Sequence, residues 1–256
     1  MSSRLKKSLA VAAVSAFSLM VHAADNVVEV GSAEDPETGR WIGDVTALTN
    51  YLHTYKTSST TVKLAKGDYD LTGIQMEVEG SEYGKSHLVA SGVKIVGMGE
   101  KREDVRLIGD GTCRIYRMIA DTDAKLENLT ITNGYAQAIE GVGKSGHGGG
   151  IYGSPTVTNC VITNCKADGS GGGLYGSSKI YVSDILNNFA KSGGGGAFQS
   201  YRIINSLVAG NSSGGNGGGI HGNAYGLIAG STITRNTSGV SVAGSWIARG
   251  LDEHLH

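Results

Sequence analysis

Residues 171–198 read GGGLYGSSKIYVSDILNNFAKSGGGGAF, and this stretch decides the fold because its glycine-rich opening returns near its end. The glycine triplet occurs four times at intervals of 23 residues, at Gly148–Gly150, Gly171–Gly173, Gly194–Gly196 and Gly217–Gly219. Self-similarity at one fixed period is the sequence signature of a solenoid, in which each repeat packs against its neighbours. The period is too short for a helix and two strands, so we expect each repeat to be one coil of short strands.

Polar and apolar residues alternate between the triplets, which is the period of a strand. In our alignment of the repeats, an aliphatic residue or Thr precedes an Asn by three positions: Thr130 and Asn133, Val161 and Asn164, Ile185 and Asn188, Val208 and Asn211, Ile233 and Asn236. Two positions before the aliphatic residue or Thr stands a small polar residue (Asn128, Asn159, Ser183, Ser206, Ser231). Two positions before that small polar residue stands an apolar one (Leu126, Val157, Tyr181, Ile204, Ala229). Equivalent residues of stacked coils lie about 5 Å apart. We therefore expect the five asparagines to form one structural ladder.

Ring-bearing residues recur with the same period directly after the inward aliphatic position. They are Tyr152, Tyr175, Phe198 and His221. Alternation along a strand places them outward, stacked along one face of the solenoid. Such a ladder can bind the faces of sugars or a protein partner, or it can stack on itself and stiffen the coils. Both interpretations stay open from the sequence, and these four residues are our candidate ligand-binding residues.

The N-terminus has the layout of a secretory signal peptide over residues 1–23. Arg4, Lys6 and Lys7 precede an apolar run, and a small-residue pattern ends at Ala23. The run is short for a transmembrane helix, and no later segment approaches the length of one. We therefore expect an exported protein that is extracellular, at the cell surface or outer membrane, or in the periplasm, without a membrane span after cleavage.

The rest of the chain divides into four parts by its patterning. Residues 24–60 form an N-terminal cap, in which Asp44 is the expected N-cap of an amphipathic helix with Val45, Leu48, Leu52 and Tyr55 on one face. Residues 61–125 hold irregular opening coils, with strands expected over 61–64, 93–96, 105–108 and 114–119. Residues 126–245 form the regular coils, and 246–256 a C-terminal tail. The helix would cover the open end of the first coil.

Charge and cysteine content narrow the classes further. The formal net charge is −1, so nothing indicates a nucleic-acid partner. Three cysteines (Cys113, Cys160 and Cys165) are too few for a disulfide scaffold, and an extended segment would hold the last two apart. We expect buried thiols.

Several segments resemble the pectin-lyase-like family of right-handed parallel β-helices. Residues 62–69 (VKLAKGDY) and 92–99 (GVKIVGMG) look like the opening coils of that family, and residues 126–134 (LENLTITNG) like its first regular coil. The repeats also resemble those of polymorphic outer membrane proteins, which carry a Gly-Gly-Ala-aliphatic and a Phe-x-x-Asn motif. Here the first is mostly Gly-Gly-Gly-aliphatic, and an aliphatic residue or Thr replaces the Phe. The resemblance implies an all-β, right-handed parallel β-helix with a short N-terminal capping helix, a fold that hosts enzymes and adhesins alike.

Catalytic residues are sparse in the regular coils. Lyases on this fold hold Ca²⁺ with clustered carboxylates and use an Arg or Lys base. After Glu127, Asp184 is the next carboxylate along the sequence that falls in the core of a strand. Arg235 is expected two coils further on, which is about 10 Å from Asp184 along the axis of the solenoid. The Gly triplets lack the Asp of calcium-binding repeats, and His147 and His221 stand in different coils. We predict no catalytic residues, no metal site and no cofactor, with Ca²⁺ only under a lyase alternative.

Two functions from different classes remain. The first is an exported adhesion-type module that recognises a surface glycan or protein through its stacked strand face. The alternative is a polysaccharide-active enzyme of the pectate-lyase type. The chain can also be the N-terminal fragment of a larger surface protein.

Overall fold

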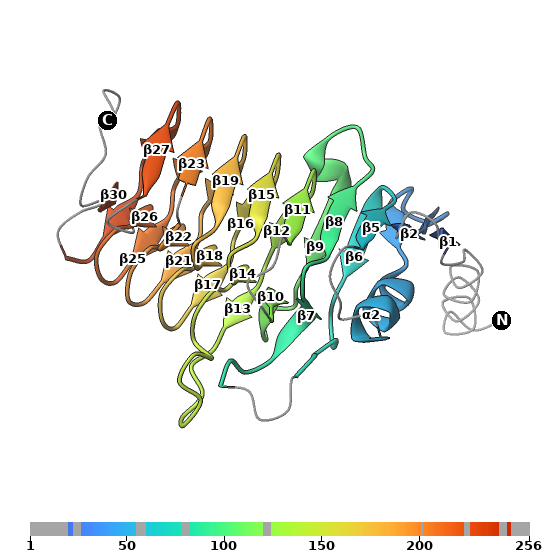
Figure 1. The fold of residues 1–256 in the computed structure, drawn as a ribbon, viewed down its shortest axis with the longest axis horizontal. Coiled ribbons are helices and arrows are strands. Elements are labelled where there is room, and N and C mark those ends of the chain that lie inside the picture. Colours follow the sequence, from blue (N-terminus) through green and yellow to red (C-terminus); the bar gives the residue numbers. More distant parts are fainter. Residues whose placement is uncertain are drawn as a thin grey trace.

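The computed structural model describes residues 20–22, 27–54, 60–77, 82–119, 124–200, 202–222, 226–240 and 245–246. Most of the predicted signal peptide, Tyr55 and the end of the predicted tail lie outside these ranges. The described residues form a parallel β-helix, which confirms the fold class predicted from the repeat. Strands of successive coils stack side by side along the long axis of the molecule (Figure 1).

Each regular coil visits four sheets in the order A, B, D and C, and then returns to A one level further on. The A sheet contains β1 (Met20–His22), β2 (Val27–Val30), β5 (Thr61–Leu64), β8 (Lys94–Gly97), β11 (Lys125–Glu127), β15 (Thr156–Thr158), β19 (Lys179–Tyr181), β23 (Arg202–Ile204) and β27 (Leu227–Ala229). The B sheet contains β3 (Ser32–Glu34), β4 (Trp41–Gly43), β6 (Gly67–Asp70), β9 (Val105–Ile108), β12 (Thr130–Thr132), β16 (Val161–Thr163), β20 (Asp184–Leu186), β24 (Leu207–Ala209) and β28 (Thr232–Thr234).

The other two sheets are shorter. The C sheet contains β7 (Ser86–Ala90), β10 (Arg114–Met118), β14 (Ile151–Tyr152), β18 (Leu174–Tyr175), β22 (Ala197–Phe198), β26 (Ile220–His221) and β30 (Ser245–Trp246). The D sheet contains β13 (Tyr135–Ala136), β17 (Lys166–Ala167), β21 (Phe189–Ala190), β25 (Ser212–Ser213) and β29 (Thr237–Ser238). Between these strands the described pairings are parallel except β1 with β2 and β3 with β4, both at the N-terminal end, and two isolated antiparallel bridges join Met76 to Ser86 and Ile139 to Val142. Since β30 pairs with β26, the stacked strands reach Trp246, the first residue of the predicted tail.

The core is a set of aliphatic columns, because every second residue of each strand points into the coil. In the A sheet, Leu126, Val157, Ile180 and Ile203 are in register and at most 1% exposed. The B sheet repeats this with Ile131, Ile162, Ile185 and Val208. Aliphatic residues of one coil stack on the equivalent aliphatic residues of the next, so each coil covers the apolar surface of its neighbour.

An N-terminal helix closes one end of this core, as predicted. It is α2 (Val45–Thr54), and Asp44 caps it, with its Oδ1 accepting a hydrogen bond from the backbone N–H of Ala47 at 2.9 Å. Leu48 and Leu52 are fully buried in the main core. Figure 1 shows α2 at the N-terminal end of the stack, beside β6 and β7. A second short helix, η1 (Arg102–Asp104), interrupts the chain between β8 and β9.

The register corrects our alignment of the repeats by one residue. Ile162 pairs with Ile185, so Asn164 is level with Asn187, and Cys165 is level with Asn188. The predicted single ladder is therefore two columns. Asn133 and Asn164 belong to an outer column at a corner with positive φ, whose members are Asn133 (φ 62°), Asn164 (φ 55°), Asn187 (φ 54°), Gly210 (φ 67°) and Arg235 (φ 54°). Asn188, Asn211 and Asn236 form a buried inner column headed by Cys165.

The same slip affects the other two predicted columns. Ser183, Ser206 and Ser231 are level with Cys160, while Asn128 and Asn159 belong to a left-handed corner column that continues through Val182, Asn205 and Gly230. Tyr181, Ile204 and Ala229 point outward, because Ile180, Ile203 and Ile228 occupy the inner positions. A slip of one residue exchanges the two faces of a strand, and doublets such as Asn187-Asn188 satisfy either alignment.

The Gly triplets are packed corners where each coil touches the next. The first residue of each triplet has a positive φ, for example 71° at Gly171. The second has no room for a side chain, because a Cβ on Gly172 would lie 2.4 Å from the carbonyl oxygens of Gly195 and Phe189. Backbone bonds such as Gly172 N–H to the carbonyl of Gly194 (3.2 Å) join successive triplets. Glycine here is a steric requirement of stacking.

Candidate ligand-binding site

The four predicted ring residues form a continuous ladder on the outer side of the C sheet. They are held by β14, β18, β22 and β26, whose parallel register stacks each residue on its equivalent. The ring centroids of Tyr152 and Tyr175 are 5.1 Å apart, as are those of Tyr175 and Phe198, with interplanar angles of 17° and 3°. His221 follows Phe198 at 4.8 Å but is tilted by 55°. We call these residues the aromatic ladder.

The stacking decides which part of each ring a ligand can touch. Tyr175 has Tyr152 on one face and Phe198 on the other, and the His147 ring lies 4.6 Å away. Sugar rings bind aromatic residues best across an open ring face. Because these faces are occupied by neighbouring rings, the ladder presents ring edges and tyrosine hydroxyls instead.

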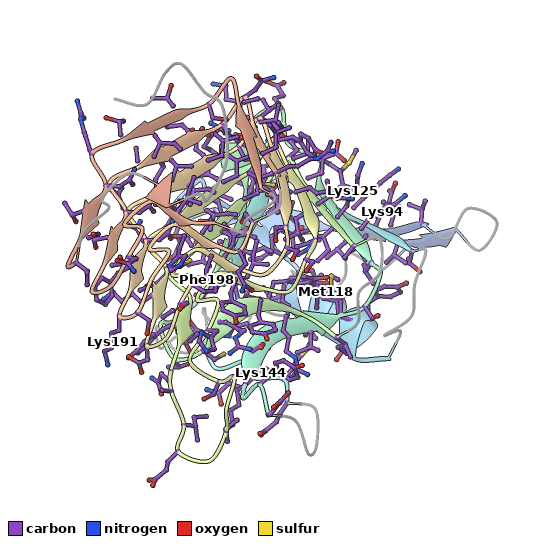
Figure 2. The ribbon with its side chains drawn as sticks, turned by 60° about the vertical axis from the view of Figure 1, so that its left-hand side comes forward. Lys94, Met118, Lys125, Lys144, Lys191 and Phe198 are labelled. Carbon is purple, nitrogen blue, oxygen red and sulfur yellow. The ribbon has the colours of Figure 1, made fainter. Side chains whose placement is uncertain are left out.

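A groove of about 310 Å³ runs beside the N-terminal half of the ladder. Its lining is mostly polar or aromatic and comes from several coils: Tyr83, Met118, Ile119, Tyr152, Gly153, Ser154, Tyr175, Gly176, Ser177 and Gln199. Ser154 and Ser177 are equivalent residues of two coils, and the backbone N–H of Ser177 donates to Ser154 Oγ at 3.2 Å. We call this cavity the ladder groove. In Figure 2, Phe198 and Lys144 lie on the side of the coils away from Lys94 and Lys125 of the A sheet.

Two arginines of β10 meet the N-terminal end of the ladder. Arg117 of β10 pairs with Tyr152 of β14, so it occupies the position equivalent to Tyr152 in the preceding coil. Its guanidinium lies 4.3 Å from the ring centre of Tyr83, and that of Arg114 lies 5.0 Å from the ring centre of Tyr152. Both residues are buried, with 1% of Arg114 and 3% of Arg117 exposed. We call them the arginine pair.

Electrostatics in this region reflect burial of positive charge. Burial, and secondly the charge of Arg117, lower the pKa of Arg114 to about 10. Burial likewise lowers the pKa of Arg117 and raises that of Tyr152 to about 12. Tyr83, which contacts the guanidinium of Arg117, belongs to the segment 82–85, and Lys144 anchors this segment through its ion pair with Glu82.

Sequence reasoning missed Tyr83, Arg114 and Arg117. The coils at this end are longer than 23 residues: Lys94, Lys125 and Thr156 are in register at intervals of 31. Arg117 is therefore 35 residues from Tyr152 and falls outside the repeat that revealed the ladder. Two arginines in the short strand Arg114–Met118 (RIYRM) are the one signal that the sequence offers.

The inner asparagine column has a structural role. Asn188 Oδ1 accepts from the backbone N–H of Cys165 at 2.9 Å, and its Nδ2 donates to the carbonyl of Ile162 and to Asn211 Oδ1, both at 3.0 Å. Asn211 and Asn236 repeat this pattern one coil further on. These amides satisfy backbone groups at a corner where the sheet ladder is interrupted.

The remaining sequence candidates also have structural partners. Asp184 forms an ion pair with Arg102 of η1, and Arg102 also donates to the carbonyl of Val182 at 3.3 Å. Arg235 occupies the outer column that contains Asn187 and Gly210, with a φ of 54°. All three cysteines are free and buried, as predicted, and burial raises the pKa of each thiol to about 12.

Within the described part of the chain, no cluster of three His, Cys, Asp or Glu side chains is arranged to hold a metal ion. The same residues contain no helix with the length and apolar character needed to cross a membrane. Comparison of the chain with models of protein families, with curated proteins and with solved structures found no match.

Proposed function

We propose that this protein is an exported binding module that holds a glycan in the ladder groove. The observation that carries the proposal is the groove itself, which follows a stack of aromatic edges across successive coils. Its volume of about 310 Å³ is at the small end of the range of ligand sites, about 300–1,000 Å³. Hydroxyl and amide groups of Ser154, Ser177 and Gln199 stand beside those edges.

This lining suits a sugar chain for physical reasons. Sugars combine apolar C–H surfaces with many hydroxyls, so they match a wall that alternates ring edges with short polar side chains. Because the lining repeats with each coil, a polymer with its own repeat would meet equivalent groups at successive levels. A protein partner would need a larger surface, since specific protein interfaces bury about 800 Å² on each side.

Two single substitutions test the proposal on a glycan array. Ser177→Trp fills the groove from an exposed position, and Thr232→Trp places the same ring at an exposed position of the B sheet. We expect the mature protein and the Thr232→Trp variant to retain the same glycans, and the Ser177→Trp variant to lose them. Equal retention by both variants, or retention of no glycan by the mature protein, would contradict the proposal.

A further inference from the structure

The arginine pair is an unusual element of the ladder's N-terminal end. Arg114 and Arg117 are both buried, and arginine stays charged in proteins because its pKa is so high. Within the described residues no carboxylate pairs with either guanidinium. Burying a charge is costly unless it is paired and hydrogen-bonded, so the folded protein gains if an anion joins this pair.

The donors that lack partners define the chemistry of that anion. Nη2 of Arg114 donates to the backbone carbonyls of Lys144 and Ser145. Nε and Nη1 of Arg114, and the same two atoms of Arg117, are buried without a hydrogen-bond partner among the described residues. Nε and Nη1 lie on different edges of a guanidinium, so each arginine offers two separate N–H donor groups, and the two residues together offer four donor nitrogens to the oxygens of an anion.

Nearby charge and space point the same way. Lys144, whose backbone carbonyl accepts a hydrogen bond from Arg114, forms an ion pair with Glu82, so this nearby carboxylate is already bound. Tyr83 lines the ladder groove on one side, while Gly84 and Lys85 line a second cavity of about 380 Å³ on the other. Both cavities therefore adjoin the segment 82–85, whose Tyr83 contacts the guanidinium of Arg117.

We propose that Arg114 and Arg117 form an oxyanion site beside Tyr83 and Tyr152, which takes a phosphate or sulfate group. Four donor nitrogens from two residues suit a tetrahedral oxyanion with three or four acceptor oxygens better than a carboxylate with two. The group reaches the site either as the free ion or as an ester on a ligand in the ladder groove. The ester alternative rests on the proposed function, and the free-ion alternative is independent of it.

The first test is thermal unfolding of the mature protein in sodium sulfate, phosphate, acetate or chloride at one ionic strength. We expect a saturable rise in Tm with sulfate and phosphate, roughly 5–10 °C at a hundredfold excess over Kd. Acetate should raise it less, and chloride should not raise it. Since sulfate also stabilises proteins in general, variants are needed. The Arg117→Met variant should lose the saturable rise, and Lys179→Met, at an exposed A-sheet position, should keep it.

The outcomes separate the possibilities. An equal rise in Tm with sulfate in the wild type, Arg117→Met and Lys179→Met would overturn the site. The wild type would also contradict it by showing no saturable rise in Tm, or no heat of binding when it is titrated with sulfate in a calorimeter. If Arg117→Met fails to fold, Arg117→Lys keeps the charge but removes the unpartnered Nε and Nη1 donors, and it should bind sulfate at least tenfold more weakly. Preference for a sulfated over an unsulfated form of one oligosaccharide would assign the site to a groove ligand. Sulfate binding without that preference would assign it to the free ion, even if no glycan binds.

Discussion

Adjacent residues Asn187 and Asn188 provide a matched pair for testing the coil register. Each is replaced by Ala and by Gly, giving four variants of the mature protein. Asn188 is 1% exposed and belongs to the inner column, whereas Asn187 occupies the outer corner with φ 54°. The two positions should respond to the same substitutions in opposite ways.

At Asn188, replacement with Ala removes the partner of the Cys165 N–H and one partner of the Ile162 carbonyl. A buried backbone group left without a partner costs about 1–3 kcal/mol. We therefore expect Asn188→Ala to lower the free energy of unfolding by about 2–4 kcal/mol. Asn188→Gly should lose about 0.5–1 kcal/mol more, because Gly gives the unfolded chain greater freedom.

At Asn187 the order of the two variants should reverse. Ala pays about 1–2 kcal/mol in the left-handed region that Asn187 occupies, while Gly adopts it without a steric penalty. Asn187→Ala should thus be the less stable variant, and Asn187→Gly should lie close to the wild type.

Urea unfolding followed by circular dichroism measures all four variants. The decisive quantity is the difference between the Gly and Ala variants at each position. The same sign at both positions would refute the register, as would a smaller loss for Asn188→Ala than for Asn187→Ala.

Three further predictions address the corners, the charges and the chemistry. Gly172→Val should lose more than about 2 kcal/mol because its Cβ overlaps two carbonyl oxygens; Gly143→Val, where a Cβ has open space, is the control, and similar denaturation midpoints would contradict the packed corner. Burial opposes ionisation of Asp110, but hydrogen bonds from Thr112 and Gly73 outweigh it and lower its pKa to about 2, so its stabilisation is full above pH ~4 and lost as the pH falls through about 2. Asp110→Asn should therefore be less stable than the wild type at pH 6, with a deficit that shrinks toward pH 2 in acid titrations; a constant deficit would rule this out. Finally, the mature protein should release no unsaturated product from polygalacturonate with or without Ca²⁺, because Arg102 engages Asp184, and release abolished by Asp184→Ala would instead establish a lyase.

The solenoid, its coil length and the ring ladder could be predicted from the sequence. The Gly triplets and the ring residues recur at one period, and stacking turns a period directly into neighbours in space. The helix at residues 45–54 was also predictable, since its N-cap and apolar face are local signals.

The register at two corners could not be predicted. The doublet Asn187-Asn188 places an acceptable residue in both the inner and the outer column. At Val182-Ser183 the β-branched Val182 occupies the left-handed corner (φ 50°), against its local preference. Only the packing of the whole coil selects the alignment, because it buries Ile180 and Ile185 and exposes their neighbours.

The arginine pair was beyond sequence reasoning for a different reason. Tyr83, Lys144 and the two arginines come from three separate segments, in coils whose insertions break the 23-residue period. Local patterning carries no information on contacts of this kind.

The groove proposal is tested most directly by removing two hydroxyls from the ladder without disturbing its stacking. Tyr152→Phe/Tyr175→Phe keeps both rings and both neighbours, so the unfolding midpoint should stay close to that of the wild type. Titration with a glycan retained on the array should show at least a tenfold weaker Kd for this double variant, because the hydroxyls stand at the ring edges that line the groove. An unchanged Kd with an unchanged midpoint would mean that the ladder stiffens the coils and takes no part in binding.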